Sequence, residues 1–226
     1  MKVVVSIGGS VLAPDLDADR VADYADAIQS LDARRHTTRD RCRRWPGRVF
    51  VGSAGIGRER DRLDQLGIAV TRLNGRLLIA ALDDRAAPTP AESYDEGREA
   101  IRRGDIPVLG GIVAAQTTDA VAAAFAEYVG ADLLVYATSV PGVYNADPNE
   151  DDDATRFDEL GADELVDVIA DIEMDAGSSA PVDLLAAKII QRSGIRTMVL
   201  DGTDPERVVR AVEDGEFDGS EILPEA

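Results

Sequence analysis

Cysteine and histidine are almost absent from this chain of 226 residues: Cys42 is its single cysteine and His36 its single histidine. A single cysteine excludes an internal disulfide and a cysteine metal cluster. A single histidine argues against a Ser-His-Asp triad and against a metal site built from several histidines. The common hydrolase triads and zinc sites are therefore poor interpretations of this sequence.

Lysine is also rare, since the chain holds only Lys2 and Lys188. With 43 acidic residues against 24 lysines and arginines, the net charge is −19 and the isoelectric point is near 4.3. Such a charge repels nucleic acids and anionic membranes, so we predict neither as a partner. An acidic, lysine-poor surface is typical of proteins that stay soluble in concentrated salt and indicates a halophile. An ordinary acidic cytosolic protein is the alternative.

Long hydrophobic runs are missing as well. No segment approaches the roughly eighteen consecutive apolar residues of a membrane helix. The apolar start from Val3 to Ile7 is too short for a signal peptide and is followed at once by two glycines. The sequence therefore predicts a cytoplasmic protein.

Strand and helix patterns alternate along the chain, and this alternation predicts a mainly parallel sheet with helices on its faces. The 45% hydrophobic content is enough for the core of a single domain that spans residues 1–226. Strands are expected at 3–7, 106–109, 131–137, 196–200 and 220–223. Helices are expected at 17–31, 71–82, 91–103, 117–129, 162–170, 182–191 and 204–213.

Residues 34–62 break this pattern, because they hold ten arginines and few of their apolar residues keep a period. One interpretation is an arginine-rich substrate patch. We favour the hypothesis that the segment is translated out of frame. The codons of Trp45-Pro46 contain a glycine codon in the next frame, and CGN arginine codons across 41–45 would permit Val-Val-Gly-Gly-Gly there. An unaltered reading frame in the resequenced gene would exclude this hypothesis.

The twelve residues 137–148, ATSVPGVYNADP, follow an apolar run that predicts a buried parallel strand. Hydroxyls and amides after such a strand lie at the carboxyl edge of the sheet, where open α/β sheets bind nucleotides. The phrase resembles the ATP-binding loop of the amino-acid-kinase family, in the variant of archaeal uridylate (UMP) kinases. The resemblance implies a three-layer αβα sandwich. It also implies an ATP site that includes Thr138, Ser139, Tyr144 and Asp147, although residues 145–148 alone also fit an ordinary Asx or Pro turn.

Gly8-Gly9-Ser10, directly after the first strand, has the composition of a phosphate-binding turn. Glycines let the backbone amides approach an anion, so we assign Gly9 and Ser10 to the ATP phosphates. A plain tight turn is the alternative. Much of the superfamily has a lysine where this chain has Ser6, and the archaeal UMP kinases that it resembles also lack that lysine.

Gly110-Gly111 leads to hydroxyls at the start of a predicted helix, which suits a second anion. A helix that is merely N-capped would give the same pattern. The resemblance assigns Asp64 to the ribose of UMP. It assigns the remaining UMP contacts to seven consecutive residues, Ile112, Val113, Ala114, Ala115, Gln116, Thr117 and Thr118.

Lys188 is the candidate catalytic residue, because a mobile ammonium group can neutralise the charge that develops during phosphoryl transfer. A solvated surface lysine is the alternative. Asp183, on the same predicted helix, is a further candidate. We assign no side chain as a metal ligand and expect Mg²⁺ to arrive with ATP.

The resemblance covers nearly all of the chain except residues 33–62, and it implies phosphoryl transfer from MgATP to UMP in pyrimidine nucleotide biosynthesis. The N-terminal half, about residues 1–125, would bind UMP, and the C-terminal half, about 126–226, would bind ATP. The resemblance also implies a hexamer built from dimers, with UTP as an inhibitor.

Two alternatives stay open. One is another kinase of the superfamily, acting on a carboxylate, a carbamate or an isoprenoid phosphate. The other is a nucleotide-binding protein without turnover, because residues 33–62 do not show the second glycine-rich loop of the family.

Overall fold

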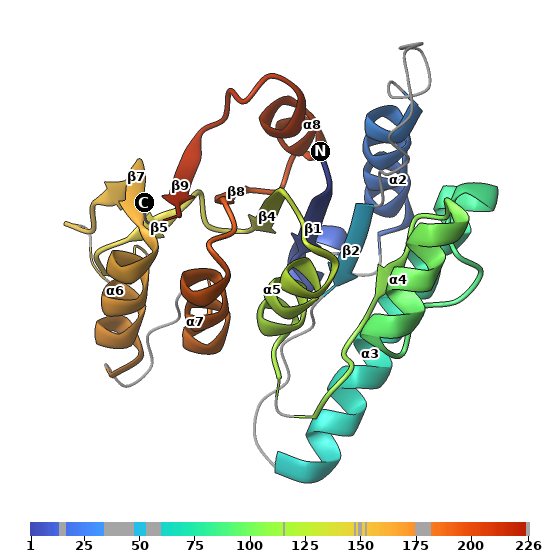
Figure 1. Ribbon diagram of the computed structural model, residues 1–226, viewed down its shortest axis with the longest axis horizontal. Helices are drawn as coiled ribbons and strands as arrows, with labels where there is room; N and C mark the ends of the chain where they lie inside the picture. The colour runs from blue at the N-terminus through green and yellow to red at the C-terminus, as the bar shows by residue number, and fades with distance from the viewer. Residues whose placement is uncertain are drawn as a thin grey trace.

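The chain folds into an α/β sandwich whose seven-stranded sheet lies between two layers of helices (Figure 1). The computed structural model describes residues 1–13, 17–33, 48–52, 60–114, 116–146, 148, 151, 153–174 and 182–224, with the backbone alone for 33, 48–52, 60–64, 173 and 174. The fold class predicted from the sequence is confirmed.

The central sheet is parallel except at one end. Its strands run in the order β3-β2-β1-β4-β8-β9-β7. The first five pair in parallel, and β9 runs antiparallel to β8. A separate antiparallel ladder joins β5 to β6. The strand bounds are β1 Val3–Ile7, β2 Arg48–Gly52, β3 Val108–Leu109, β4 Leu133–Thr138, β5 Val143–Tyr144, β6 Arg156–Phe157, β7 Glu159–Gly161, β8 Thr197–Asp201 and β9 Gly219–Leu223.

The two faces of the sheet form two separate cores, because successive side chains of a strand point to opposite faces. Leu134 and Tyr136 of β4 belong to one core, whereas Leu133 and Val135 belong to the other. The first core includes α4–α7, with α5, α6 and α7 side by side in Figure 1, and the second includes α1, α2, α3 and α8. The helix bounds are α1 Gly9–Leu12, α2 Ala18–Ala33, α3 Arg60–Leu82, α4 Tyr94–Arg103, α5 Thr118–Val129, α6 Ala162–Met174, α7 Leu184–Ser193 and α8 Pro205–Glu213, with a 3₁₀ turn η3 at Asp83–Arg85.

Local sequence explains where several helices begin and end. Four helices start after a residue whose side-chain oxygen accepts a hydrogen bond from a backbone N–H of the first turn: Ser93, Thr117, Asp183 and Asp204. Three of these helices end at a glycine in the left-handed region, which favours glycine: Gly104, Gly130 and Gly194.

Each strand and helix predicted from the sequence is present; β1 has the predicted bounds and the others are shifted. The largest shifts are in α3, which begins at Arg60 rather than at 71, and in α6, which extends to Met174 rather than to 170. The sequence prediction missed α1 and the short strands β2, β5, β6 and β7. None of the helices in the described part of the chain has an apolar stretch long enough to cross a membrane.

Strand β2 lies inside the segment for which the sequence predicted no regular element. It pairs with β1 through Val4 and Val49 and with β3 through Phe50 and Val108, so it occupies an interior position in the sheet. Residues 60–62 of the segment begin α3, and residues 34–47 and 53–59 lie outside the described residues. The hypothesis of an out-of-frame translation stays a prediction.

Candidate active site at the carboxyl edge of the sheet

The two loops that the sequence predicted to bind ATP, after β1 and after β4, lie where the strand order of the sheet changes direction. From β1 the chain continues to β2 and β3 on one side, whereas β4 is followed by β8 on the other. Parallel sheets bind ligands beside the carboxyl ends of strands at such a switch point. Here β1 and β4 are neighbours, with Ile7 opposite Ala137, and the Gly8 N–H donates to the Ala137 carbonyl at 3.0 Å. The loops after these two strands therefore lie side by side.

On the β1 side, Gly8 is the N-cap of the short helix α1, so the chain forms a helical turn here and not a simple tight turn. The Val11 and Leu12 amides donate to the Gly8 carbonyl at 2.9 and 2.8 Å. The earlier amides, those of Gly9 and Ser10, belong to the first turn of a helix, where N–H groups have no acceptor inside the helix. The Ser10 side chain is exposed. These are donor groups of the kind that phosphate oxygens accept from.

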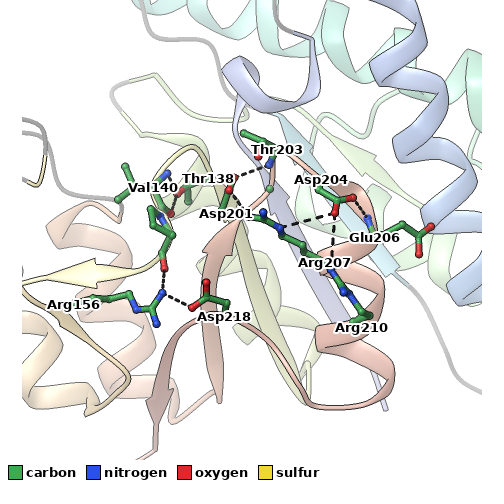
Figure 2. Close-up of polar contacts among 12 residues, drawn as sticks. Thr138, Val140, Arg156, Asp201, Thr203, Asp204, Glu206, Arg207, Arg210 and Asp218 are labelled. Carbon is green, nitrogen blue, oxygen red and sulfur yellow. Dashed lines mark hydrogen bonds and ion pairs between the residues drawn. The ribbon is translucent and has the colours of Figure 1, made fainter.

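On the β4 side, the Thr138 hydroxyl shapes the loop that follows the strand. It donates to the Val140 carbonyl at 2.7 Å and accepts from the Val140 N–H at 3.0 Å (Figure 2). Ser139 is exposed and Tyr144, in β5, is half-buried. Asp147 lies outside the described residues. The predicted role of the Thr138 hydroxyl as a ligand contact thus competes with a role in holding the turn.

The loop after β3 is clamped to α3. The Thr71 hydroxyl accepts a hydrogen bond from the Gly111 N–H at 2.8 Å. A Cβ on Gly110 would lie 2.9 Å from the Arg72 backbone nitrogen, so only glycine permits this approach. Ile112 is half-buried and Val113 is exposed.

Two buried oxygens in the next part of this loop have no hydrogen-bond partner among the described residues, namely Gln116 Oε1 and Thr118 Oγ1. Leaving a buried polar group unpaired is costly, so such atoms are typical of ligand sites. Thr117 Oγ1 caps α5 by accepting from the Ala120 N–H at 3.1 Å. Ala114 is exposed, and Ala115 lies outside the described residues.

A pair of carboxylates lies next to this loop. Asp183, the N-cap of α7, accepts a hydrogen bond from the Thr117 hydroxyl, and Asp119 accepts one from the Ser6 hydroxyl at 3.4 Å. Burial, and after it the negative charge of Asp183, raise the pKa of Asp119 to about 7, although the Ser6 hydrogen bond lowers it. Asp119 is thus poised to lose or gain a proton near neutral pH.

The sequence analysis assigned no role to Asp119, so its place in this pair was missed. Its position in the first turn of α5, directly after two threonines, was visible in the sequence. Its burial and its approach to Asp183 depend on contacts between distant parts of the chain. A local sequence pattern does not predict such contacts.

A profile described as the amino acid kinase family matches residues 1–201 of the chain. The chain belongs to the amino acid kinase family. A uridylate kinase from Haloarcula marismortui is 90% identical over the whole length of both chains. A uridylate kinase from Halobacterium salinarum is 62% identical over 100% of this chain and 94% of its own length.

A solved member of the family has the same architecture. The crystal structure of the uridylate kinase from Archaeoglobus fulgidus superimposes with a TM-score of 0.83 at 35% identity, and the alignment covers 99% of this chain and 100% of that one. The fold is therefore shared along the whole length.

Two predicted site residues remain, Lys188 and Asp64. Lys188 is exposed on α7, and its Nζ lies 3.4 Å from Gln191 Oε1 on the same helix. Asp64 falls in the second turn of α3, and its side chain lies outside the described residues. The structure thus places Gly9 and Ser10 beside the loop that follows β4, and it places Thr117 in hydrogen-bond contact with Asp183. It does not bring Lys188 into contact with either loop within the described part of the chain.

Proposed function

We propose that the protein is a uridylate kinase that transfers the γ-phosphoryl group of ATP to UMP, giving UDP. The observation that supports this most directly is the position of the loops after β1 and β4. They lie side by side at the switch point of the sheet, where backbone amides and hydroxyls can bind a nucleotide. The uridylate kinases among its relatives supply the identity of the acceptor.

We divide the site as the sequence predicted it. ATP binds to Gly9, Ser10, Thr138, Ser139, Tyr144 and Asp147. UMP binds to Asp64 and to residues 112–118, where the unpaired oxygens of Gln116 and Thr118 supply hydrogen-bonding capacity. Apart from Gly9 and Ser10, the N-terminal half of the single domain would bind the acceptor and the C-terminal half the donor.

The reaction requires little proton chemistry from the protein. The UMP phosphate is already ionised at neutral pH, so one of its oxygens attacks the γ-phosphorus in line, and the bond to the bridging oxygen breaks to release ADP. The protein holds the two phosphates in line and offers amide donors to the transferring oxygens. Lys188 remains our candidate for neutralising the developing charge.

We propose Mg²⁺ as the accompanying metal, and it neutralises part of the phosphate charge when bound. Mg²⁺ prefers oxygen ligands and is commonly held by one or two carboxylates together with substrate phosphates. Asp119 and Asp183 fit this pattern, because they are two carboxylates beside the predicted acceptor loop, each hydrogen-bonded to a neighbouring hydroxyl. In the described part of the chain no group of three or more His, Cys, Asp or Glu side chains could hold a metal ion. Phosphate oxygens would therefore supply most of the ligands.

Substrate choice tests the proposal. A coupled assay with UMP, CMP, acetylglutamate and isopentenyl phosphate should show turnover with UMP at least tenfold above the others. Turnover with a carboxylate or isoprenoid substrate instead would contradict it. Binding of ATP without turnover of any acceptor would identify a nucleotide-binding protein that is not a kinase.

Replacement of Thr118 by valine tests the acceptor site. Because the buried hydroxyl has no partner among the described residues, Thr118→Val should leave the melting temperature unchanged or slightly higher. Loss of a hydrogen bond to UMP should raise the KM for UMP about tenfold and leave the KM for ATP unchanged.

Thr197→Val is the matched control for this experiment. The buried Thr197 hydroxyl donates to the Ile195 carbonyl at 3.0 Å, far from the loops of the site. This variant should lose about 1 kcal/mol of stability and keep both KM values. An unchanged KM for UMP in Thr118→Val would show that the acceptor lies elsewhere.

The family resemblance further supports a homo-oligomer, a hexamer built from dimers, that works in the cytoplasm of a halophile and is inhibited by UTP. An exposed apolar stripe on α3 is available for such an assembly. It consists of leucines and alanines at helical spacing, Leu66, Ala69, Leu73, Leu77 and Ala80. A stripe along one helix can pair with its own copy about a twofold axis, so we propose a second copy of this chain as its partner.

A further inference from the structure

We propose that Arg156 is a positioning residue for ATP. It holds the loop between β4 and β5, residues 139–142 (the donor loop), against the segment that leads into β9. The inference rests on the proposed function, in which this loop binds the donor nucleotide. Arg156 belongs to β6, which pairs with β5 at the far end of the loop.

The guanidinium of Arg156 has partners on both sides. Its Nη1 donates to the Pro141 carbonyl at 3.3 Å. The same nitrogen lies 2.6 Å from Asp218 Oδ1 (Figure 2), and Nη2 lies 3.2 Å from Asp158 Oδ1. Two carboxylates thus hold the planar guanidinium group in one orientation, and one of its N–H groups donates to a backbone carbonyl of the loop. The side chain is three-quarters buried, which limits competition from water.

The aliphatic part of Arg156 also packs against the loop. Gly142 has a φ of +144°, and a Cβ on it would lie 2.7 Å from Arg156 Cδ and 2.6 Å from Ser220 Oγ. The next residue, Val143, donates its N–H to Ser220 Oγ at 2.8 Å. Pro141, Gly142 and Val143 are therefore each fixed to Arg156 or Ser220.

The start of the same loop is held by local hydrogen bonds between Thr138 and Val140 and by the Gly202 N–H, which donates to the Thr138 carbonyl at 2.8 Å. With both ends fixed, Ser139 at the exposed tip keeps one position relative to β1. A loop that is already in its binding conformation loses less entropy when the nucleotide binds. Arg156 should therefore affect ATP binding and leave the acceptor loop after β3 unaffected.

Binding of a non-hydrolysable ATP analogue and of UMP, measured separately by calorimetry on the full chain, tests this role. Arg156→Met keeps the aliphatic stem and removes the fork, and we expect analogue affinity to fall about tenfold with UMP affinity unchanged. Arg156→Lys should recover part of the loss, because its ammonium can reach one of the partners but cannot reproduce the fork.

Arg192→Met is the matched control. Arg192 pairs with Glu127 through Nε at 3.0 Å and Nη2 at 2.6 Å, and it lies near the C-terminus of α7, away from both loops. It should change neither affinity. If Arg156→Met fails to fold, Asp218→Asn, which removes the closest carboxylate, should show the same selective loss to a smaller degree.

The outcomes separate this inference from the proposed function. Suppose that the parent protein binds both nucleotides. An unchanged analogue affinity in Arg156→Met, or an equal loss of affinity for both ligands, would then overturn the positioning role alone. A parent protein that binds no ATP analogue would overturn the donor-site assignment, and the positioning role with it.

Discussion

The surroundings of Asp119 change the pKa of its carboxyl group. A carboxyl group that is buried beside another carboxylate favours its neutral form, and this raises its pKa to about 7. The hydrogen bond from the Ser6 hydroxyl lowers the pKa and offsets part of this rise. The protein thus keeps an acidic group near its midpoint of titration at the edge where phosphates would bind, a pattern common at functional sites.

The pH dependence of stability should report this group in the absence of nucleotides. Because the folded-state pKa is raised, the contribution of Asp119 is fully present below about pH 4 and is lost as the pH rises to about 7. Asp119→Asn, which is neutral at every pH, should flatten this slope and add on the order of 2 kcal/mol of stability at pH 8. Chemical denaturation of both proteins at pH 5 and pH 8 measures the difference.

Asp183→Asn provides the comparison for that experiment. Removing the neighbouring charge should lower the pKa of Asp119 and shift the slope to lower pH, because the charge of Asp183 is the second cause of the shift. Identical slopes in the parent and in Asp119→Asn would show that Asp119 is ionised throughout.

At the scale of elements, the site depends on how closely α3 approaches the loop after β3. Glycine at positions 110 and 111 allows this approach, since a Cβ at either would lie 2.9 Å from an α3 atom, in Arg72 or Ile68. The Thr71 hydroxyl then holds the Gly111 N–H. The helix thus fixes the start of the acceptor loop through contacts that only glycine permits.

Gly110→Ala should separate these two elements. The new methyl group meets backbone atoms of α3, so we expect a loss of about 1–3 kcal/mol and a higher KM for UMP, with the KM for ATP unchanged. Thermal unfolding and steady-state kinetics measure both effects.

Gly67→Ala, on the same helix, is the control because nothing lies within 4 Å of its Cβ position. It should stabilise the protein by up to about 1 kcal/mol through helix propensity. Equal effects of the two substitutions would refute the close approach as the cause.

On the scale of the whole molecule, the long helix α3 leaves apolar side chains in solvent. Leu66 and Leu73 are 54% and 48% exposed, in a chain whose net charge of −19 otherwise favours separate molecules. Concentrated salt screens this repulsion and strengthens apolar contacts. Assembly through the α3 stripe should therefore increase with salt.

A charge in the stripe should prevent this assembly. Leu73→Glu together with Leu77→Glu should reduce the mass observed by light scattering in molar salt, while the parent forms the larger species. Leu185→Glu, at a similarly exposed leucine of α7, should keep the parent mass. A monomeric parent at every salt concentration would contradict the proposed homo-oligomer.

The sequence by itself determined most of the elements, the loop after β4 and the family, because period, capping residues and turn chemistry are local properties. It predicted the alternation of strands and helices, and the loop from Thr138 to Asp147. It missed β2, whose Val and Phe lie among arginines, and the short β5–β6 ladder, which has too few residues to show a period.

The tertiary structure alone decided which side chains meet. Asp119 lies near Ser6, and Thr117 meets Asp183, because the helices that follow β3 and precede β8 pack on the same face of the sheet. The contact of Arg156 with Asp218 arises in the same way, from segments 62 positions apart in the numbering. Such meetings depend on strand order and register, which no stretch of a few residues encodes.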